Sequence, residues 1–133
     1  MPLTIKKPTG GKLVKGRDHY LQCQFTWDDG THPDLTTSHF YVTMKESDTQ
    51  DDEDAIIAFN SEDNADQFIN IDNSEGIMDI WFKKEDQEDI VTNTVNYCAD
   101  LVVVLTDGTE WPFILDYNIT FAQPITRKIT HEA

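Results

Sequence analysis

The sequence has few cysteines and no long apolar run, and each shortage argues against a class of protein. Two cysteines, Cys23 and Cys98, are too few for a disulfide framework, so we expect free thiols, as in a reducing compartment. The N-terminus lacks the apolar core of a signal peptide, and no stretch approaches the roughly 18 apolar residues that span a bilayer. We therefore expect neither secretion through a signal peptide nor membrane insertion.

Basic residues are also scarce. The 133 residues include 10 Lys and Arg against 25 Asp and Glu, which gives a formal net charge of -15. Such a molecule repels polyanions and anionic membranes, so we expect no direct nucleic-acid partner and no membrane partner. The hydrophobic content of 38%, with 11% aromatic residues, is enough for a packed core. The length predicts one domain over residues 1–133.

Sequence motifs for chemistry are missing as well. The histidines are scattered without zinc-ligand spacing, and there is no nucleophile elbow, phosphate-binding loop or dinucleotide fingerprint. Carboxylates are so abundant that some pairs will lie at glycosidase spacing by chance, so their number does not indicate hydrolysis. We expect no catalytic residues, no cofactor and no metal.

What the sequence does contain is alternation of apolar and polar residues in short runs. The clearest run spans 20–27, where Leu21, Cys23, Phe25 and Trp27 share a face. Further strands are predicted over 40–45, 55–59, 67–71, 76–82, 94–105 and 111–121. A tight turn at Asp107-Gly108 joins the last two, and residues 83–90 form at most a turn of helix. Because no long segment has helical periodicity, we predict an all-β, immunoglobulin-like antiparallel β-sandwich of seven to eight strands.

Strand parity assigns structural roles to several side chains. Cys23 shares the core face with Trp27, whereas Cys98 points away from the apolar face of its own strand, which argues against a disulfide between them. Tyr97 fits a tyrosine corner, with a buried ring and a hydroxyl bonded to backbone. Trp81 is harder to place. If it is exposed, a carbohydrate-binding module that stacks sugars on tryptophan is an alternative function.

Charge is unevenly distributed along the chain. Residues 1–17 contain no acid, whereas residues 46–89 contain sixteen acids. One reading makes the N-terminal segment an ordinary first strand through Leu3 and Ile5. The other makes it an arm, hinged at residues 8–11, whose cations dock on the acidic loop of a neighbouring copy. The partner-binding candidates are Lys6, Lys7, Lys12, Lys15 and Arg17 with Asp51, Asp52, Glu53 and Asp54.

The acidic run over 48–54 also invites comparison with a calcium loop. It lacks the glycine and the flanking helices of a helix–loop–helix calcium site. The remaining readings are a solvated loop and a landing site for a basic partner. A further alternative is an acidic inhibitor that mimics nucleic acid, which clustering of the sixteen acids on one face would favour and even scatter would not.

Short motifs give a family resemblance. These motifs are the turn Lys15-Gly16-Arg17-Asp18 before the 20–27 strand, Asp29-Gly30, Asp34-Leu35, Tyr97, Asp100, Gly108 and Thr126-Arg127. The sequence resembles the immunoglobulin-like domains of tailed-phage structural proteins, such as the N-terminal domain of the baseplate upper protein, although Ala99 stands where those domains carry an aromatic residue. The resemblance implies a non-enzymatic virion protein of the tail, baseplate or capsid surface. Such a protein is made in the host cytoplasm and assembles with other virion proteins or copies of itself.

Overall fold

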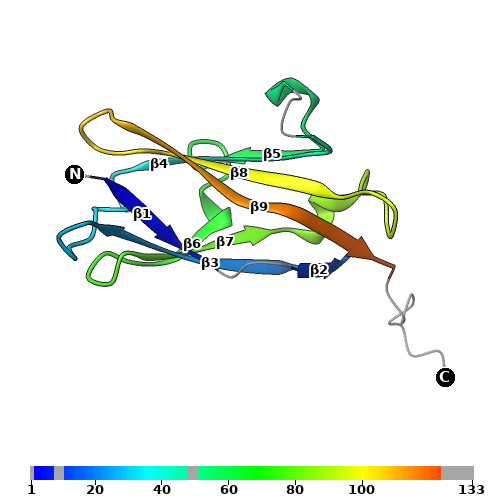
Figure 1. Cartoon of the computed structure of the whole chain (residues 1–133), viewed down its shortest axis with the longest axis horizontal. Helices are drawn as coiled ribbons and strands as arrows, with labels where there is room; N and C mark the ends of the chain where they lie inside the picture. The colour runs from blue at the N-terminus through cyan, green and yellow to red at the C-terminus, as the bar shows by residue number, and fades with distance from the viewer. Residues whose placement is uncertain (1, 8–10, 48–50, 124–133) are drawn as a thin grey trace.

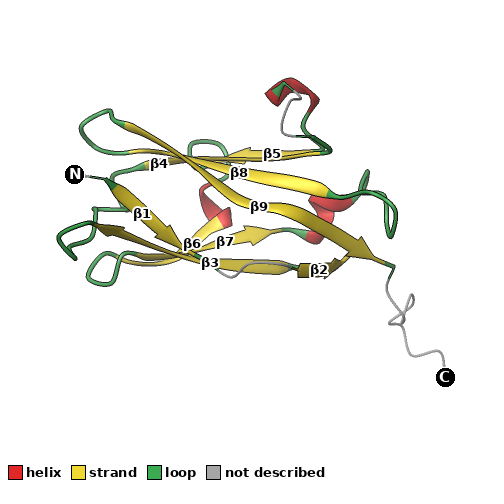
Figure 2. Cartoon of the chain, viewed as in Figure 1, coloured by secondary structure: helices red, strands yellow, loops and turns green. Residues whose placement is uncertain are grey.

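The computed structural model describes residues 2–7, 11–47 and 51–123, and over them the chain forms two packed β-sheets (Figures 1 and 2). Nine strands lie in the described residues: β1 Leu3–Lys6, β2 Gly11–Val14, β3 His19–Trp27, β4 His39–Lys45, β5 Ile57–Asn60, β6 Phe68–Asp72, β7 Ile77–Phe82, β8 Tyr97–Val104 and β9 Glu110–Ala122. Three short 3-10 helices connect them: η1 Asp52–Asp54, η2 Ala65–Gln67 and η3 Lys84–Gln87. The fold is an all-β sandwich.

The strand order has the immunoglobulin pattern. One sheet has the order β1-β3-β7-β6 and the other β2-β9-β8-β4-β5. These orders correspond to the ABED sheet and to the GFC sheet with one more strand at each edge, β2 beside β9 and β5 beside β4, as in immunoglobulin-like domains. The predicted fold class is therefore confirmed.

Two details differ from the prediction. The described residues form nine strands and not the predicted seven to eight, because the N-terminal segment supplies two: β1 pairs with β3, and β2 pairs with β9 of the other sheet. The β2–β9 pair is parallel, whereas every other pair is antiparallel in the described residues. A four-residue strand such as Gly11–Val14 is too short for alternation to identify it. Residues 8–10 of the predicted hinge lie outside the described residues.

The core fills the space between the two inner sheet faces. The predicted inward residues of β8 are all buried, from Tyr97 to Val103. β8 lies between β9 and β4, a central position that suits its apolar residues on both sides. The strand begins at Tyr97 and not at residue 94, because residues 92–94 form a turn in which Asn93 has a positive φ of 70°. Pro112 pairs with Val102 on one side only, since β2 pairs with β9 no earlier than Ile119, so its missing N–H removes no hydrogen bond of the sheet.

The predicted structural residues have defined roles. Tyr97 is fully buried, and its hydroxyl accepts a 2.9 Å hydrogen bond from the Val91 backbone N–H, as a tyrosine corner requires. Trp27 is half-buried against the core and meets Trp111 edge to face, with ring centroids 5.8 Å apart. Gly108 has a φ of 87°, and its N–H donates to the Leu105 carbonyl at 2.9 Å, which closes the β8–β9 turn.

Both cysteines are buried free thiols. Cys23 lies in the core, whereas the Cys98 thiol faces the other side of its strand and donates to the Lys45 carbonyl at 3.7 Å. The parity argument against a disulfide between them is confirmed. Burial raises the pKa of the Cys23 thiol to about 12.

Candidate interaction surfaces

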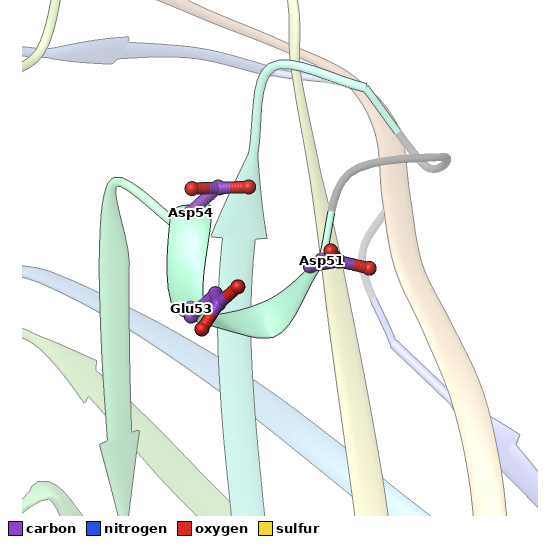
Figure 3. Close-up of side chains that lie close together, drawn as sticks. All are labelled: Asp51, Glu53 and Asp54. Carbon is purple, nitrogen blue, oxygen red and sulfur yellow. The ribbon is translucent and has the colours of Figure 1, made fainter.

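The acidic loop brings three carboxylates together. Asp51 precedes η1, while Glu53 and Asp54 lie within it, and their oxygens fall within 4.8 Å of one another (Figure 3). All three side chains are exposed. Bound through one oxygen each, three carboxylates supply about half or less of the roughly six to eight oxygens that calcium takes. The side chain of Asp52 and residues 48–50 of the predicted loop lie outside the described residues.

Two of the basic candidates lie on the other sheet from these acids. Lys6 ends β1 in the four-stranded sheet, and with Lys7 it lines a shallow depression beside Gln22, Gln24 and Ile77. The acidic loop instead follows β4 of the five-stranded sheet.

The other basic candidates lie further along the chain. Lys15 and Arg17 are half-buried in the turn before β3, and the Lys12 side chain lies outside the described residues. Because β1 and β2 pair within the chain's own sheets, the segment has the ordinary-strand arrangement. Docking of its cations on a neighbouring copy stays a prediction.

The acids of residues 46–89 are spread over several connections. Besides the η1 loop, exposed acids occupy the β5–β6 connection, the β6–β7 turn and the η3 segment: Glu62, Asp63, Asp66, Asp72, Glu75, Glu85, Asp86, Glu88 and Asp89. The η1 loop and the β6–β7 turn lie at opposite ends of the sandwich (Figure 1). This distribution is the scatter that favours solubility over mimicry of a nucleic-acid strand.

The outer surface of the five-stranded sheet carries an apolar patch. Cross-strand partners place Tyr41 beside Val102 and Val102 beside Pro112 in one row over β4, β8 and β9. Val104 and Ile114 flank that row on the same face. Tyr41 is 38% exposed and Ile114 44% exposed. We call these five residues the apolar face.

Acidic residues border the apolar face. Asp100 lies opposite Ile114, and Glu110 lies opposite Val104. At the β4 end, the Glu62 carboxylate is 3.7 Å from His39 Nδ1. The apolar face therefore has an acidic border on the strands and loops that surround it.

The outer surface of the four-stranded sheet is different, because it carries a stacked aromatic pair. Tyr20 of β3 and Trp81 of β7 are cross-strand partners, with ring centroids 5.8 Å apart and ring planes 16° apart. Tyr20 is 56% exposed, the largest exposure among the large apolar side chains of the described residues. We call this pair the aromatic platform.

Polar contacts hold the aromatic platform in place. The Trp81 indole N–H donates to an Asp18 carboxylate oxygen at 3.2 Å, and the same oxygen accepts from the Lys84 N–H at 3.0 Å. This backbone hydrogen bond, with the indole as a smaller contributor, lowers the pKa of Asp18. The Lys83 ammonium lies 4.9 Å from the Trp81 ring centroid, and Asp66 holds it at 2.7 Å. Hydrogen bonding to Asp66 raises the pKa of Lys83.

A partly open apolar cavity of about 170 Å³ lies between the sheets near β2. Leu13, Leu21, Phe82 and Leu115 supply much of its wall, and Tyr20 lies at its border. A cavity of this size holds one small apolar molecule at most.

Comparison with known proteins adds no identity. No protein-family model matches the chain, and no curated protein matches it. Within the described residues, no helix has the length and apolar character to cross a membrane.

Sequence reasoning identified Trp81 as a candidate sugar-stacking residue, but it missed Tyr20 as its partner and missed the apolar face of the other sheet. Tyr20 alternates with the apolar residues of its strand and so lies on the polar side, and only the register that sets it against Trp81 reveals the stack. Val102 and Val104 are apolar residues on the outer side of β8. The apolar face consists of outward apolar side chains on three neighbouring strands. It can be identified only when the pairing order of those strands is known.

Proposed function

We propose that the chain is a non-enzymatic virion protein of a tailed phage, located in the tail, baseplate or capsid surface, and that it works through protein–protein contact. The observation that carries the proposal is the apolar face of the five-stranded sheet. The virion setting rests on the sequence resemblance, which includes the turn before β3 and the Tyr97 strand.

The apolar face has the character of a contact surface. An antiparallel sheet with one side in water normally alternates apolar-in and polar-out, so apolar side chains on the outer side of three adjacent strands need a partner to leave water. Tyr41 lies in a row with Val102 and Pro112. A tyrosine in such a row supplies a large contact area with a polar tip, which is why tyrosine is enriched in interfaces.

Charge specifies the partner. A net charge of -15 makes copies of the chain repel one another, and the apolar face is bordered by Asp100, Glu110 and Glu62. The partner that this surface fits is another virion protein, with an apolar patch surrounded by lysine or arginine. Self-association through the apolar face would contradict this assignment.

The first test is composition of the particle. Density-purified particles of the virus that encodes the chain should contain it at a fixed number of copies, measured by quantitative mass spectrometry. Particles that lack the chain would overturn the virion assignment.

The second test addresses the surface. Particles are assembled with the chain supplied in trans, either as Ile114→Lys or as the matched control Val91→Lys. The two native side chains are 44% and 45% exposed, but Val91 lies outside the apolar face. We expect Ile114→Lys to enter particles at least about tenfold less than the native chain, because it replaces an apolar contact with a charge that the interface would bury. We expect Val91→Lys to enter normally. Equal incorporation of both variants would refute the role of the apolar face.

A further inference from the structure

The aromatic platform lies on the sheet opposite the apolar face, so it is available to a ligand while the apolar face holds a partner. We propose that the aromatic platform, with the polar side chains beside it, binds a neutral oligosaccharide of pyranose units. This inference does not depend on the virion assignment, and it is tested on the isolated chain.

Tyr20 is the more accessible ring of the pair, because it is 56% exposed whereas Trp81 is half-buried. The Trp81 indole stacks on Tyr20, and the Lys83 ammonium lies 4.9 Å from its ring centroid, held by Asp66 at 2.7 Å. The aromatic surface offered to a ligand is therefore mainly the Tyr20 ring. A flat, exposed aromatic face packs against the C–H face of a pyranose ring, which is the apolar side of a sugar.

Tyr20 is supported before any ligand arrives. Asp18 fixes the indole through its N–H, and the Gln67 amide donates to the Trp81 carbonyl at 2.9 Å. Gln67 is itself only 2% exposed. A ring held in this way loses little conformational entropy when it binds, so more of the contact energy appears as affinity.

Hydrogen-bonding groups continue along the same face. Gln22 follows Tyr20 on the outer side of β3, about 7 Å along the strand, and its cross-strand partner is Asp79. Asp79 accepts a 2.8 Å hydrogen bond from the Asn70 amide. Amides and a carboxylate beside an aromatic ring are the groups that recognise sugar hydroxyls.

Charge selects among saccharides. The whole chain repels anions through its net charge of -15. At the platform, Asp18, Asp66 and Asp79 outnumber Lys83, while Lys6 and Lys7 lie further along the face beside Gln22. Uronic or sulfated sugars are therefore disfavoured, whereas neutral pyranoses are not. Proline-rich peptides also pack on aromatic surfaces, and the experiment separates them from sugars.

The test titrates the full chain with three neutral probes, cellotetraose, chitotetraose and maltotetraose, and with an oligogalacturonate and an oligoproline. Binding is followed by calorimetry and by the NMR signal of the Trp81 indole N–H, assigned with Trp81→Phe. We expect at least one neutral probe to bind with a Kd below about 1 mM and to shift the Trp81 signal more than those of Trp27 and Trp111.

Variants locate the contact. We expect Tyr20→Ala to weaken binding at least about tenfold, as truncation of a central contact does. The matched control Tyr41→Ala removes an exposed tyrosine from the other sheet and should leave the affinity unchanged. A melting temperature measured for both variants shows that each is folded. The proposal is overturned if no neutral probe binds, if only the oligogalacturonate or the oligoproline binds, or if Tyr20→Ala binds as tightly as the native chain.

Discussion

The Tyr97 hydroxyl accepts a 2.9 Å hydrogen bond from the Val91 N–H and so links the start of β8 to the connection that precedes it. The ring beneath that hydroxyl is fully buried and meets Phe121 edge to face at 6.0 Å. Tyr97, which lies in β8, therefore contacts β9 through Phe121 and the segment before β8 through Val91.

Replacing Tyr97 with Phe should keep the packed ring and remove only the acceptor. The Val91 N–H then loses its partner in a partly buried position, so we expect the free energy of unfolding to fall by about 1–2 kcal/mol. Chemical denaturation followed by circular dichroism measures the change. Tyr41→Phe is the control, since the exposed Tyr41 hydroxyl should change stability by no more than about 0.5 kcal/mol. Equal effects would show that the Tyr97 hydroxyl has no special structural role.

The sequence predicts the sandwich because its strands alternate strictly. In β8, every second residue from Tyr97 to Val103 is buried, so parity alone places the core face and separates Cys23 from Cys98. Asp107-Gly108 likewise predicts its turn, because the turn needs one residue with a positive φ and Gly108 supplies it. These features depend on neighbours in the sequence.

Features that depend on distant pairing are not predictable in this way. Gln87 belongs to a polar connector without an apolar stripe, yet it is 1% exposed. Its amide oxygen accepts from the Gly16 N–H at 2.8 Å, and its amide nitrogen donates to the Arg17 carbonyl at 2.7 Å. Nothing in residues 83–90 indicates that the turn before β3 will need those two groups. The aromatic platform escapes prediction for the same reason, because its two rings are 61 positions apart in the printed sequence.

Burial should make Cys23 unreactive in the folded chain. The thiolate is the reactive species, and burial raises the pKa of this thiol to about 12. We therefore expect a thiol reagent in mildly alkaline buffer to label Cys23 far more slowly in the native chain than in denaturant, measured by mass spectrometry. A Cys98→Ser variant isolates the Cys23 signal. Native labelling at the rate of the denatured chain would contradict the buried position.

Acid should destabilise the fold, because the same hydrogen-bonded Asp turn occurs at four positions. Asp29, Asp34, Asp72 and Asp107 each accept hydrogen bonds from the hydroxyl and N–H of the Thr or Ser two residues on. Hydrogen bonding from those hydroxyls is the largest cause that lowers the pKa of all four carboxyls from the ordinary 3.8.

A lowered folded-state pKa stabilises the fold above the ordinary value, and that stability is lost as the pH falls through the folded-state pKa. The melting temperature should therefore decline below about pH 4. Thr109→Ala removes the hydroxyl donor, so the pKa of Asp107 in that variant should rise toward its ordinary value in an NMR titration. An unchanged Asp107 titration would contradict the hydrogen-bond origin of the shift.

Four glycines in the described residues have a positive φ, and Gly76 should tolerate substitution least among them. Its φ is 65°, and a Cβ there would lie 2.3 Å from the Phe25 carbonyl oxygen and 2.7 Å from His32 Nδ1. Both atoms are fixed, since Phe25 donates its N–H to the Gly76 carbonyl at 2.8 Å and His32 Nδ1 lies 2.8 Å from the Phe25 carbonyl. We expect Gly76→Ala to lower the free energy of unfolding by about 3 kcal/mol or more, from the clash and backbone strain together.

Gly108→Ala is the matched control for that clash. Gly108 also has a positive φ, 87°, but a Cβ there would meet nothing within 4 Å. Backbone strain alone should cost about 1–2 kcal/mol. Chemical denaturation gives the loss of unfolding free energy for each variant. The difference between the two losses measures the cost of the clash between β3 and the β6–β7 turn. Equal losses would mean that this contact relaxes without cost, and that the turn is free to move away from β3.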